Sequence, residues 1–174
     1  MEKISEILNS KIKPKEKTAQ LVLALQQGEI SVAQLLDFFR QAKDPEKGTC
    51  LSGLTQITKD NPAFVKDHID FIISQLTYKA PRVKWEAAET IANISKGYPD
   101  KAAKAIPNLL AISEDEGTVV RWSAALALTE IAKNNPETRK ELVPYIEKKA
   151  VTETQNGVKK IYAKALKAIK KEKA

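Results

Sequence analysis

The sequence predicts an all-α chain, a right-handed α-solenoid of about four helical pairs with a single C-terminal capping helix. The stretch Val83–Ile94 recurs thirty-seven residues later as Val120–Ile131, with the basic residue, the tryptophan, the alanine pair and the two aliphatic residues in register. The dipeptides Asn61-Pro62, Tyr98-Pro99 and Asn135-Pro136 keep the same spacing. A composition poor in glycine and aromatic residues favours helices, and a fixed period of this length is typical of repeat solenoids.

The first 43 residues are expected to form an irregular N-terminal repeat with a cap, because a terminal repeat has one face in water. Its expected segments are an amphipathic helix over Met1–Ser10, a basic linker over Lys11–Lys17 and a helical hairpin of Thr18–Gln27 and Ser31–Ala42. Gly28 is a natural C-terminal stop inside the hairpin, and Ser31 has the hydroxyl that an N-cap favours. The core residues expected here are Leu21, Leu25, Leu35, Leu36 and Phe39.

Three regular units follow at 44–80, 81–117 and 118–155, and 156–174 is expected to be the capping helix of the same single domain. In each unit a first helix is followed by a turn and a second helix. The second helix is expected to begin at the repeated proline, which loses no hydrogen bond at the first helical position. The buried residues expected in the three second helices are Ile69, Ile72 and Ile73, then Ile106, Leu109 and Leu110, then Val143 and Ile146.

Two further prolines, Pro107 and Pro144, lie about eight residues into the second helices of the last two units. A proline inside a helix deletes one backbone hydrogen bond, and its ring clashes with the carbonyl group four residues earlier. We therefore predict a kink or a restart just before the residue that precedes each of these prolines. The helix that begins at Pro62 has Asp70 at this position and is predicted to run straight.

The repeated motifs also carry a family resemblance. Val83-Lys84-x-x-Ala87-Ala88 and Val120-Arg121-x-x-Ala124-Ala125 are each followed by aliphatic residues, and the second helix has Ile106-Pro107-x-Leu109-Leu110. Together these residues resemble the HEAT repeat, in the bacterial HEAT-like form that is also seen in phycobilisome-lyase-like proteins. The resemblance covers about Asp44 to Ala168. Tetratricopeptide repeats are excluded, since their period is about 34 residues.

One cation recurs in every unit, in a ladder of Lys47, Lys84, Arg121 and Lys159. The resemblance implies that these side chains bond acids or carbonyl groups in the adjoining loops and so tie one repeat to the next, with Asp44 and Asp115 as candidate acids. The alternative is a basic stripe that contacts phosphate along one edge of the molecule. We favour the structural role, because cations at helix starts lie beside the inter-repeat loops.

The net charge of +7 belongs to one end of the chain. From Lys133 onwards there are 12 basic and 5 acidic residues, whereas the first 132 residues contain 17 of each. A local excess of this kind can attract an acidic partner. Four lysines, expected on the outer face of the capping helix, are therefore candidates for a basic surface: Lys160, Lys164, Lys167 and Lys171. A solvated cap is the simpler explanation, because a terminal repeat needs a soluble outer face.

The sequence contains no sign of a catalytic, cofactor or metal site. It has no glycine-rich phosphate loop, and its one cysteine and one histidine cannot share a metal or form a catalytic pair. Cys50 occupies the position of Ala87 and Ala124, so we expect a small buried residue, and His68 is expected in a core or capping role. No apolar run approaches the roughly 20 residues needed to span a bilayer, and one cysteine fits a reducing cytoplasm.

Candidate partner-binding residues come from two faces. Trp85 and Trp122 lie on the flank of their helices, where they either pack between repeats or form exposed aromatic anchors for a protein partner; we favour packing, given how much surface a tryptophan normally buries. The second-helix face offers Lys104, Asn108, Tyr145 and Lys148.

We therefore predict a non-catalytic protein–protein interaction module or scaffold in the cytoplasm, without a cofactor or a metal. It is expected to bind an unidentified protein partner, to stay off membranes and to be a monomer or a weak oligomer. The alternative is a nucleic-acid-binding protein of the HEAT-like DNA glycosylase type that uses the basic C-terminal end. Trp85 precedes Glu89 by one helical turn, as such a site would need, but Trp122 precedes Leu126. We expect no glycosylase or lyase activity and at most weak binding of nucleic acid.

Overall fold

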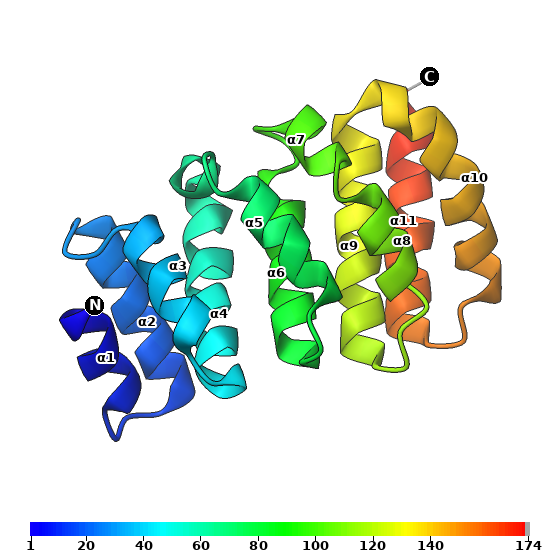
Figure 1. The fold of residues 1–174 in the computed structure, drawn as a ribbon. Coiled ribbons are helices and arrows are strands. Elements are labelled where there is room, and N and C mark those ends of the chain that lie inside the picture. Colours follow the sequence, from blue (N-terminus) through cyan, green and yellow to red (C-terminus); the bar gives the residue numbers. More distant parts are fainter. Residues whose placement is uncertain (173–174) are drawn as a thin grey trace.

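The computed structural model describes residues 1–172, and all regular structure in this range is helical (Figure 1). The α-helices are α1 (Glu2–Asn9), α2 (Pro14–Gln26), α3 (Val32–Gln41), α4 (Asp44–Asp60), α5 (Ile69–Ser74), α6 (Pro81–Ile94), α7 (Pro99–Ala103), α8 (Ile106–Ile112), α9 (Thr118–Asn134), α10 (Pro136–Thr152) and α11 (Asn156–Glu172). Two short 3-10 helices, η1 (Pro62–Val65) and η2 (Gln75–Thr77), flank α5. None of the described helices is long and apolar enough to cross a bilayer.

The helices form two rows, and the chain is an all-α repeat solenoid. The inner row consists of α2, α4, α6, α9 and α11, each packed on the next, and the outer row consists of α3, α5, α8 and α10 (Figure 1). The two ends of the chain lie at opposite ends of this array, so contacts are made mainly between neighbouring repeats. The buried apolar residues form one continuous core along the seam between the rows.

The four sides of α6 show how an inner-row helix packs against its neighbours. With about 3.6 residues per turn, Ile91 and Ile94 share the side that faces the outer row, and both are fully buried. One flank lies against α4 and the other against α9. The remaining side stays partly open to solvent and carries Arg82, Trp85 and Glu89.

The N-terminal repeat follows the predicted pattern with one correction. Ser31 caps α3 by accepting a hydrogen bond from the backbone N–H of Gln34, and Gly28 ends the preceding helix with a φ of 71°. The predicted basic linker over Lys11–Lys17 is wrong, because α2 already begins at Pro14. A proline that looks like a helix breaker in a basic stretch here occupies the first helical position, where no hydrogen bond is lost.

The three second helices differ in how they meet the proline prediction. The restart before Pro107 is confirmed, since α7 ends at Ala103 and α8 begins at Ile106. The straight helix predicted from Pro62 is wrong, because the chain there divides into η1 and α5 without any proline at the break. No restart occurs at Pro144, because α10 continues through it, and the alternative, a kink before Val143, stays a prediction.

Contacts with neighbouring elements, and not proline alone, decide where these helices break. At the break between η1 and α5, the carbonyl oxygen of Lys66 is free of the helix and accepts a hydrogen bond from Nζ of Lys101 in the next repeat at 2.8 Å. By contrast, α10 packs against both α9 and α11 and buries Leu142, Ile146 and Lys149 along its length. This packing holds α10 continuous at the expense of one backbone hydrogen bond.

Candidate interaction surface

The open sides of the inner row form one surface, which we name the first-helix face. It consists of the exposed stripes of α6, α9 and α11, and the repeat brings equivalent positions into line. Trp85 of α6, Trp122 of α9 and Lys160 of α11 are one repeat apart, as are Glu89, Leu126 and Lys164. The two tryptophans and two of the four candidate lysines therefore belong to the same surface, which was not expected from the sequence.

The structure separates the two tryptophans. Trp85 is half-buried and packs against the core, whereas Trp122 is 37% exposed. Val119, one turn before Trp122, is 50% exposed, and Leu126, one turn after it, is half-buried. These three residues form an apolar strip on α9. The equivalent strip on α6 carries Arg82 and Glu89 instead, so the exposed apolar surface is confined to the later repeat.

A groove between α9 and α11 continues this strip. Its volume is about 220 Å³, and Leu126 belongs both to the strip and to the groove wall. The other residues that line it are Thr129, Glu130 and Lys133 of α9 and Ile161, Lys164, Ala165 and Ala168 of α11. Glu130 and Lys133 form an ion pair with each other, while Lys164 lies at the rim without an acidic partner among the described residues.

The four candidate lysines of the C-terminal end lie along one exposed stripe of α11. Lys160, Lys164, Lys167 and Lys171 follow helical spacing, and all four are exposed. The opposite side of α11 is buried through Val158, Tyr162 and Ile169. The basic surface is thus adjacent to the groove and continuous with the first-helix face.

The candidates on the second-helix face are less well placed for a partner. Lys104 is exposed and forms a solvent-exposed ion pair with Asp70 at 3.8 Å. The hydroxyl of Tyr145 lies 2.5 Å from Oγ of Ser113 and donates to Glu114, so this side chain is engaged in joining α8 to α10. Lys148 is exposed and Asn108 is half-buried, on α10 and α8 respectively. The structure does not bring these four residues into one cluster with the tryptophans.

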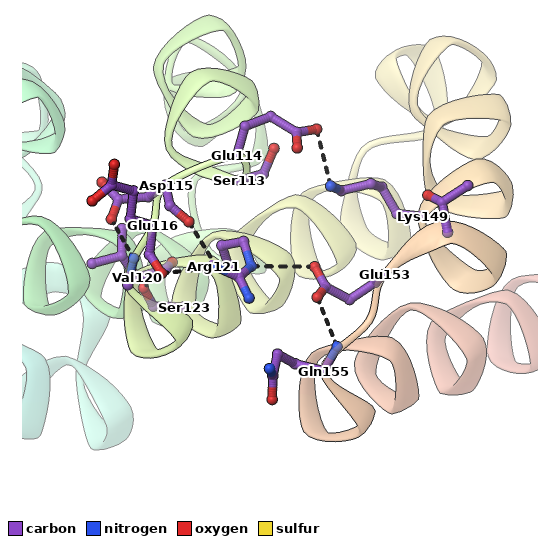
Figure 2. Close-up of polar contacts among 12 residues, drawn as sticks. Ser113, Glu114, Asp115, Glu116, Val120, Arg121, Ser123, Lys149, Glu153 and Gln155 are labelled. Carbon is purple, nitrogen blue, oxygen red and sulfur yellow. Dashed lines mark hydrogen bonds and ion pairs between the residues drawn. The ribbon is translucent and has the colours of Figure 1, made fainter.

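The cation ladder ties successive repeats together, as the resemblance implied, at Lys84 and at Arg121, and Figure 2 shows the contacts of Arg121. Nζ of Lys84 lies 2.7 Å from Oδ2 of Asp115, in the loop before α9. Arg121 donates to the carbonyl oxygens of Asp115 and Glu116 at 2.8 and 3.1 Å, and its Nε lies 3.4 Å from Oε2 of Glu153 in the loop before α11. Each cation therefore reaches the loop that precedes the next first helix.

Hydrogen bonds to these acids set their protonation. Burial raises the pKa of Asp115, but the Lys84 ammonium and the backbone N–H of Gly117 outweigh it and leave the pKa lowered. Burial likewise raises the pKa of Glu153, while the backbone N–H of Gln155 and the guanidinium of Arg121 lower it further than burial raises it. Both carboxylates are held ionised as structural partners of the ladder.

The first and last cations behave differently. Lys47 lies over two aromatic rings, 5.0 Å from the centroids of Phe39 and Tyr78, instead of bonding an acid. The expected acid Asp44 accepts a hydrogen bond from the hydroxyl of Tyr78 at 2.7 Å. Lys159 is half-buried at the start of the capping helix. The sequence pattern therefore located the ladder, but the aromatic substitute at Tyr78 could be found only in the structure.

Cys50 and His68, the one cysteine and the one histidine, occupy structural positions. Cys50 is fully buried, as predicted, and burial followed by the charge of Glu46 raises its pKa to about 12. His68 is half-buried before the first turn of α5 and caps it without a side-chain hydrogen bond. Among the described residues, no three histidine, cysteine or acidic side chains are placed to hold a metal ion.

No protein-family model and no curated protein matches this sequence. Solved structures do match it. A designed armadillo repeat protein superposes with a TM-score of 0.71 and 19% identity, over 95% of this chain and 80% of the other. Another, solved in complex with the peptide (KR)4, superposes with a TM-score of 0.71 and 18% identity, over 93% of this chain and 78% of the other. The fold is that of an armadillo-like α-solenoid. At such identities the likeness establishes the fold alone, and the finer HEAT-like assignment stays a prediction.

Proposed function

We propose that this chain is a non-catalytic scaffold that binds another protein through the first-helix face, with Trp122 as its anchor. The observation that carries this proposal is the exposed apolar strip of Val119, Trp122 and Leu126, which leads into the groove between α9 and α11. Tryptophan is among the residues that contribute most to binding energy at protein interfaces, because it buries a large rigid surface. An exposed apolar strip bordered by charged residues is typical of such interfaces.

Two further observations support the proposal. One armadillo-like neighbour was solved with a bound peptide, so the fold can present a peptide-binding surface. On the second-helix face, Tyr145 already bonds across to Ser113 and Glu114, and Lys104 pairs with Asp70. On the first-helix face, by contrast, the exposed residues Val119 and Trp122 lie one helical turn apart, which favours this face for a partner. The thiol of Cys50 does not suggest a nucleophile, since it is buried and its pKa is raised to about 12.

Selection from a random-peptide display library against the immobilised protein tests this function. Selected peptides should bind the wild-type protein in solution, and Trp122→Ser should weaken binding by at least about tenfold while leaving the denaturant midpoint unchanged. The double variant Lys104→Ala/Lys148→Ala, on the other face, should bind normally. Trp85→Ala is the matched control, which should lower stability because this ring packs against the core. Peptides that bind Trp122→Ser as well as wild type would refute the proposed face.

A further inference from the structure

We propose that the partner segment is an acidic peptide that inserts an aliphatic side chain into the α9–α11 groove and places its carboxylates against the lysines of α11. This inference rests on the proposed function and names the chemistry of the partner. Its two parts follow from two separate properties of the surface, the apolar lining of the groove and the unbalanced charge beside it.

The groove favours an aliphatic side chain. Leu126 on one wall and Ile161, Ala165 and Ala168 on the other supply hydrocarbon surface, while Thr129 and the paired Glu130 and Lys133 lie among the remaining lining residues. The small side chains of Ala165 and Ala168 open the space that larger residues would fill. Transfer of an aliphatic side chain from water into such a space is favourable in proportion to the apolar area that is buried.

The rim of the groove favours negative charge. The capping helix contains six lysines and one glutamate in NGVKKIYAKALKAIKKE, and the four lysines on its exposed stripe form no ion pair with any described residue. The lysines of the neighbouring inner-row helices α6 and α9 are already neutralised, since Lys84 pairs with Asp115 and Lys133 with Glu130. An acidic segment would supply the missing counter-charges and would be steered to the groove by them.

The same surface is poorly suited to a nucleic-acid backbone. The exposed stripe of α11 has no arginine, the residue best matched to phosphate geometry. Along the face away from α11, a phosphate chain would next meet Glu130 and then Glu89. A continuous track of unpaired cations is needed to follow a nucleic acid strand, but the cations of this face on α6 and α9, Arg82 and Lys133, are paired with Glu86 and Glu130, so only the α11 end offers unpaired ones. A short acidic segment needs only that end.

The test uses the full chain and fluorescein-labelled synthetic peptides in which glutamates flank a central pair of leucines. Anisotropy titrations compare this peptide with one whose leucines are serines and one whose glutamates are lysines. The protein variants are Lys160→Gln/Lys164→Gln/Lys167→Gln/Lys171→Gln and, as a control with the same loss of charge, Lys11→Gln/Lys13→Gln/Lys15→Gln/Lys43→Gln, all four exposed and located before α4 in the N-terminal repeat. Ala168→Glu places a carboxylate in the groove, and Ala168→Gln is its neutral control.

The α11 quadruple variant should bind the acidic peptide at least about tenfold more weakly, and the control quadruple variant should change affinity by less than about threefold. The affinity of the serine peptide should be about tenfold lower, the lysine peptide should not bind, and the Ala168→Glu protein should bind the acidic peptide more weakly than the Ala168→Gln protein.

Equal losses of affinity in both quadruple variants would overturn the inference by showing only an effect of net charge. Tighter binding of an oligothymidylate of equal charge, or self-association abolished by the α11 variant, would overturn it in favour of nucleic acid or a second copy. If display-selected peptides depend on Trp122 but are neutral or basic, the scaffold function stands and this inference fails.

Discussion

Two helix pairs of the inner row, α4–α6 and α6–α9, pack at equivalent repeat positions but differ in where their polar contacts lie. Between α4 and α6, hydrogen bonds run through the middle of the helix pair: Oγ1 of Thr55 donates to the carbonyl oxygen of Glu86 and lies 3.1 Å from Oγ1 of Thr90. Asn93 adds bonds to the backbone of Thr55 and to Thr58. Between α6 and α9, the hydrogen bonds and ion pairs of the described residues lie at the two ends, at Lys84–Asp115 and at Asn134–Ser95.

The repeat register makes this comparison direct. Thirty-seven residues on, the Thr55–Thr90 pair becomes Ala92 and Ala127, both of which are buried. A buried threonine hydroxyl needs a hydrogen-bond partner, and between α4 and α6 the hydroxyls of Thr55 and Thr90 bond to each other. An alanine pair has no such requirement and allows close approach of the helices. The repeat therefore specifies which positions meet between neighbouring helices. The residues at these positions decide whether the interface is held by directional hydrogen bonds or by apolar packing alone.

The largest loss of stability is expected from truncating the shared core, and it should be equal in α6 and α9. Ile94 of α6 and Ile131 of α9 are equivalent, fully buried, and directed towards the outer row and not towards the differing flanks. Ile94→Ala and Ile131→Ala should each reduce the free energy of unfolding by about 2–5 kcal/mol, the usual cost of truncating a buried aliphatic residue. Urea denaturation at constant slope measures both. A clear inequality would show that the flanks, and not the shared core, dominate the stability of a repeat.

The next effect should distinguish the two interfaces. Ala127→Leu adds three carbon atoms to a fully buried position beside α6 and should destabilise the protein by about 1–3 kcal/mol through overpacking. Leu126→Ala, at the neighbouring half-buried position on the same helix, serves as a control and should cost less than about 1.5 kcal/mol. An Ala127→Leu protein with unchanged stability would mean that the α6–α9 interface is not closely packed.

Much of this architecture was accessible from the sequence, for identifiable reasons. The helical pairs and their core were predictable because buried aliphatic residues and N-terminal prolines repeat with one period. The breaks in the second helices were not, because the chain breaks between η1 and α5 without a proline and runs through Pro144 without a break. A local rule about proline could not foresee that α10 is braced on two sides.

The candidate site was only partly predictable. The two tryptophans have the same local sequence context, yet one packs against the core and the other is exposed. Their difference is one of tertiary packing, which periodicity within one helix does not describe. Val119 and the groove at Ala168 were missed for the same reason, since nothing in α9 or α11 alone shows that the two helices leave a space between them.

A smaller effect should reveal the directional character of the α4–α6 interface. Thr55→Ala and Thr90→Ala should each cost about 0.5–1.5 kcal/mol, because the remaining hydroxyl keeps a carbonyl partner. A double-mutant cycle should give a coupling energy of at least about 0.5 kcal/mol between them. Thr129→Ala is the matched control, since Thr129 bonds only to carbonyl groups of its own helix and should show no coupling with Thr90. Additive losses for Thr55 and Thr90 would argue against a reciprocal pair.

Acid should weaken the contacts of Asp115 and Glu153, in the loops before α9 and α11, before it affects the α4–α6 interface. Asp115 and Glu153 have folded-state pKa values below the ordinary 3.8 and 4.5, so their contribution to stability is fully present above those values and is lost as pH falls through the folded pKa. The threonine contacts of α4 with α6 do not titrate. Amide hydrogen exchange at decreasing pH should therefore show loss of protection in the loops before α9 and α11 ahead of the centre of α4. Glu153→Gln should abolish the part of this dependence seen near α11.

The smallest effect on stability is expected at the lysine stripe of α11, and here stability and binding should separate. Lys164→Ala should change the free energy of unfolding by no more than about 0.5 kcal/mol, since this side chain is exposed and unpaired among the described residues.

The four lysines of this stripe supply the local positive charge, so the wild-type chain should bind DNA weakly, at about 10⁻⁴ to 10⁻⁶ M at physiological salt and without sequence preference. Changing all four lysines to glutamine should remove this binding, whereas Trp85→Ala and Trp122→Ala should leave it unaltered, because the rings are assigned to core packing and to a protein partner. Anisotropy of a labelled oligonucleotide across a salt series measures both. Sub-micromolar binding that depends on either tryptophan would instead place stacked bases on the first-helix face, where each aromatic contact is worth about 1–3 kcal/mol, and would make nucleic acid the natural ligand of this surface.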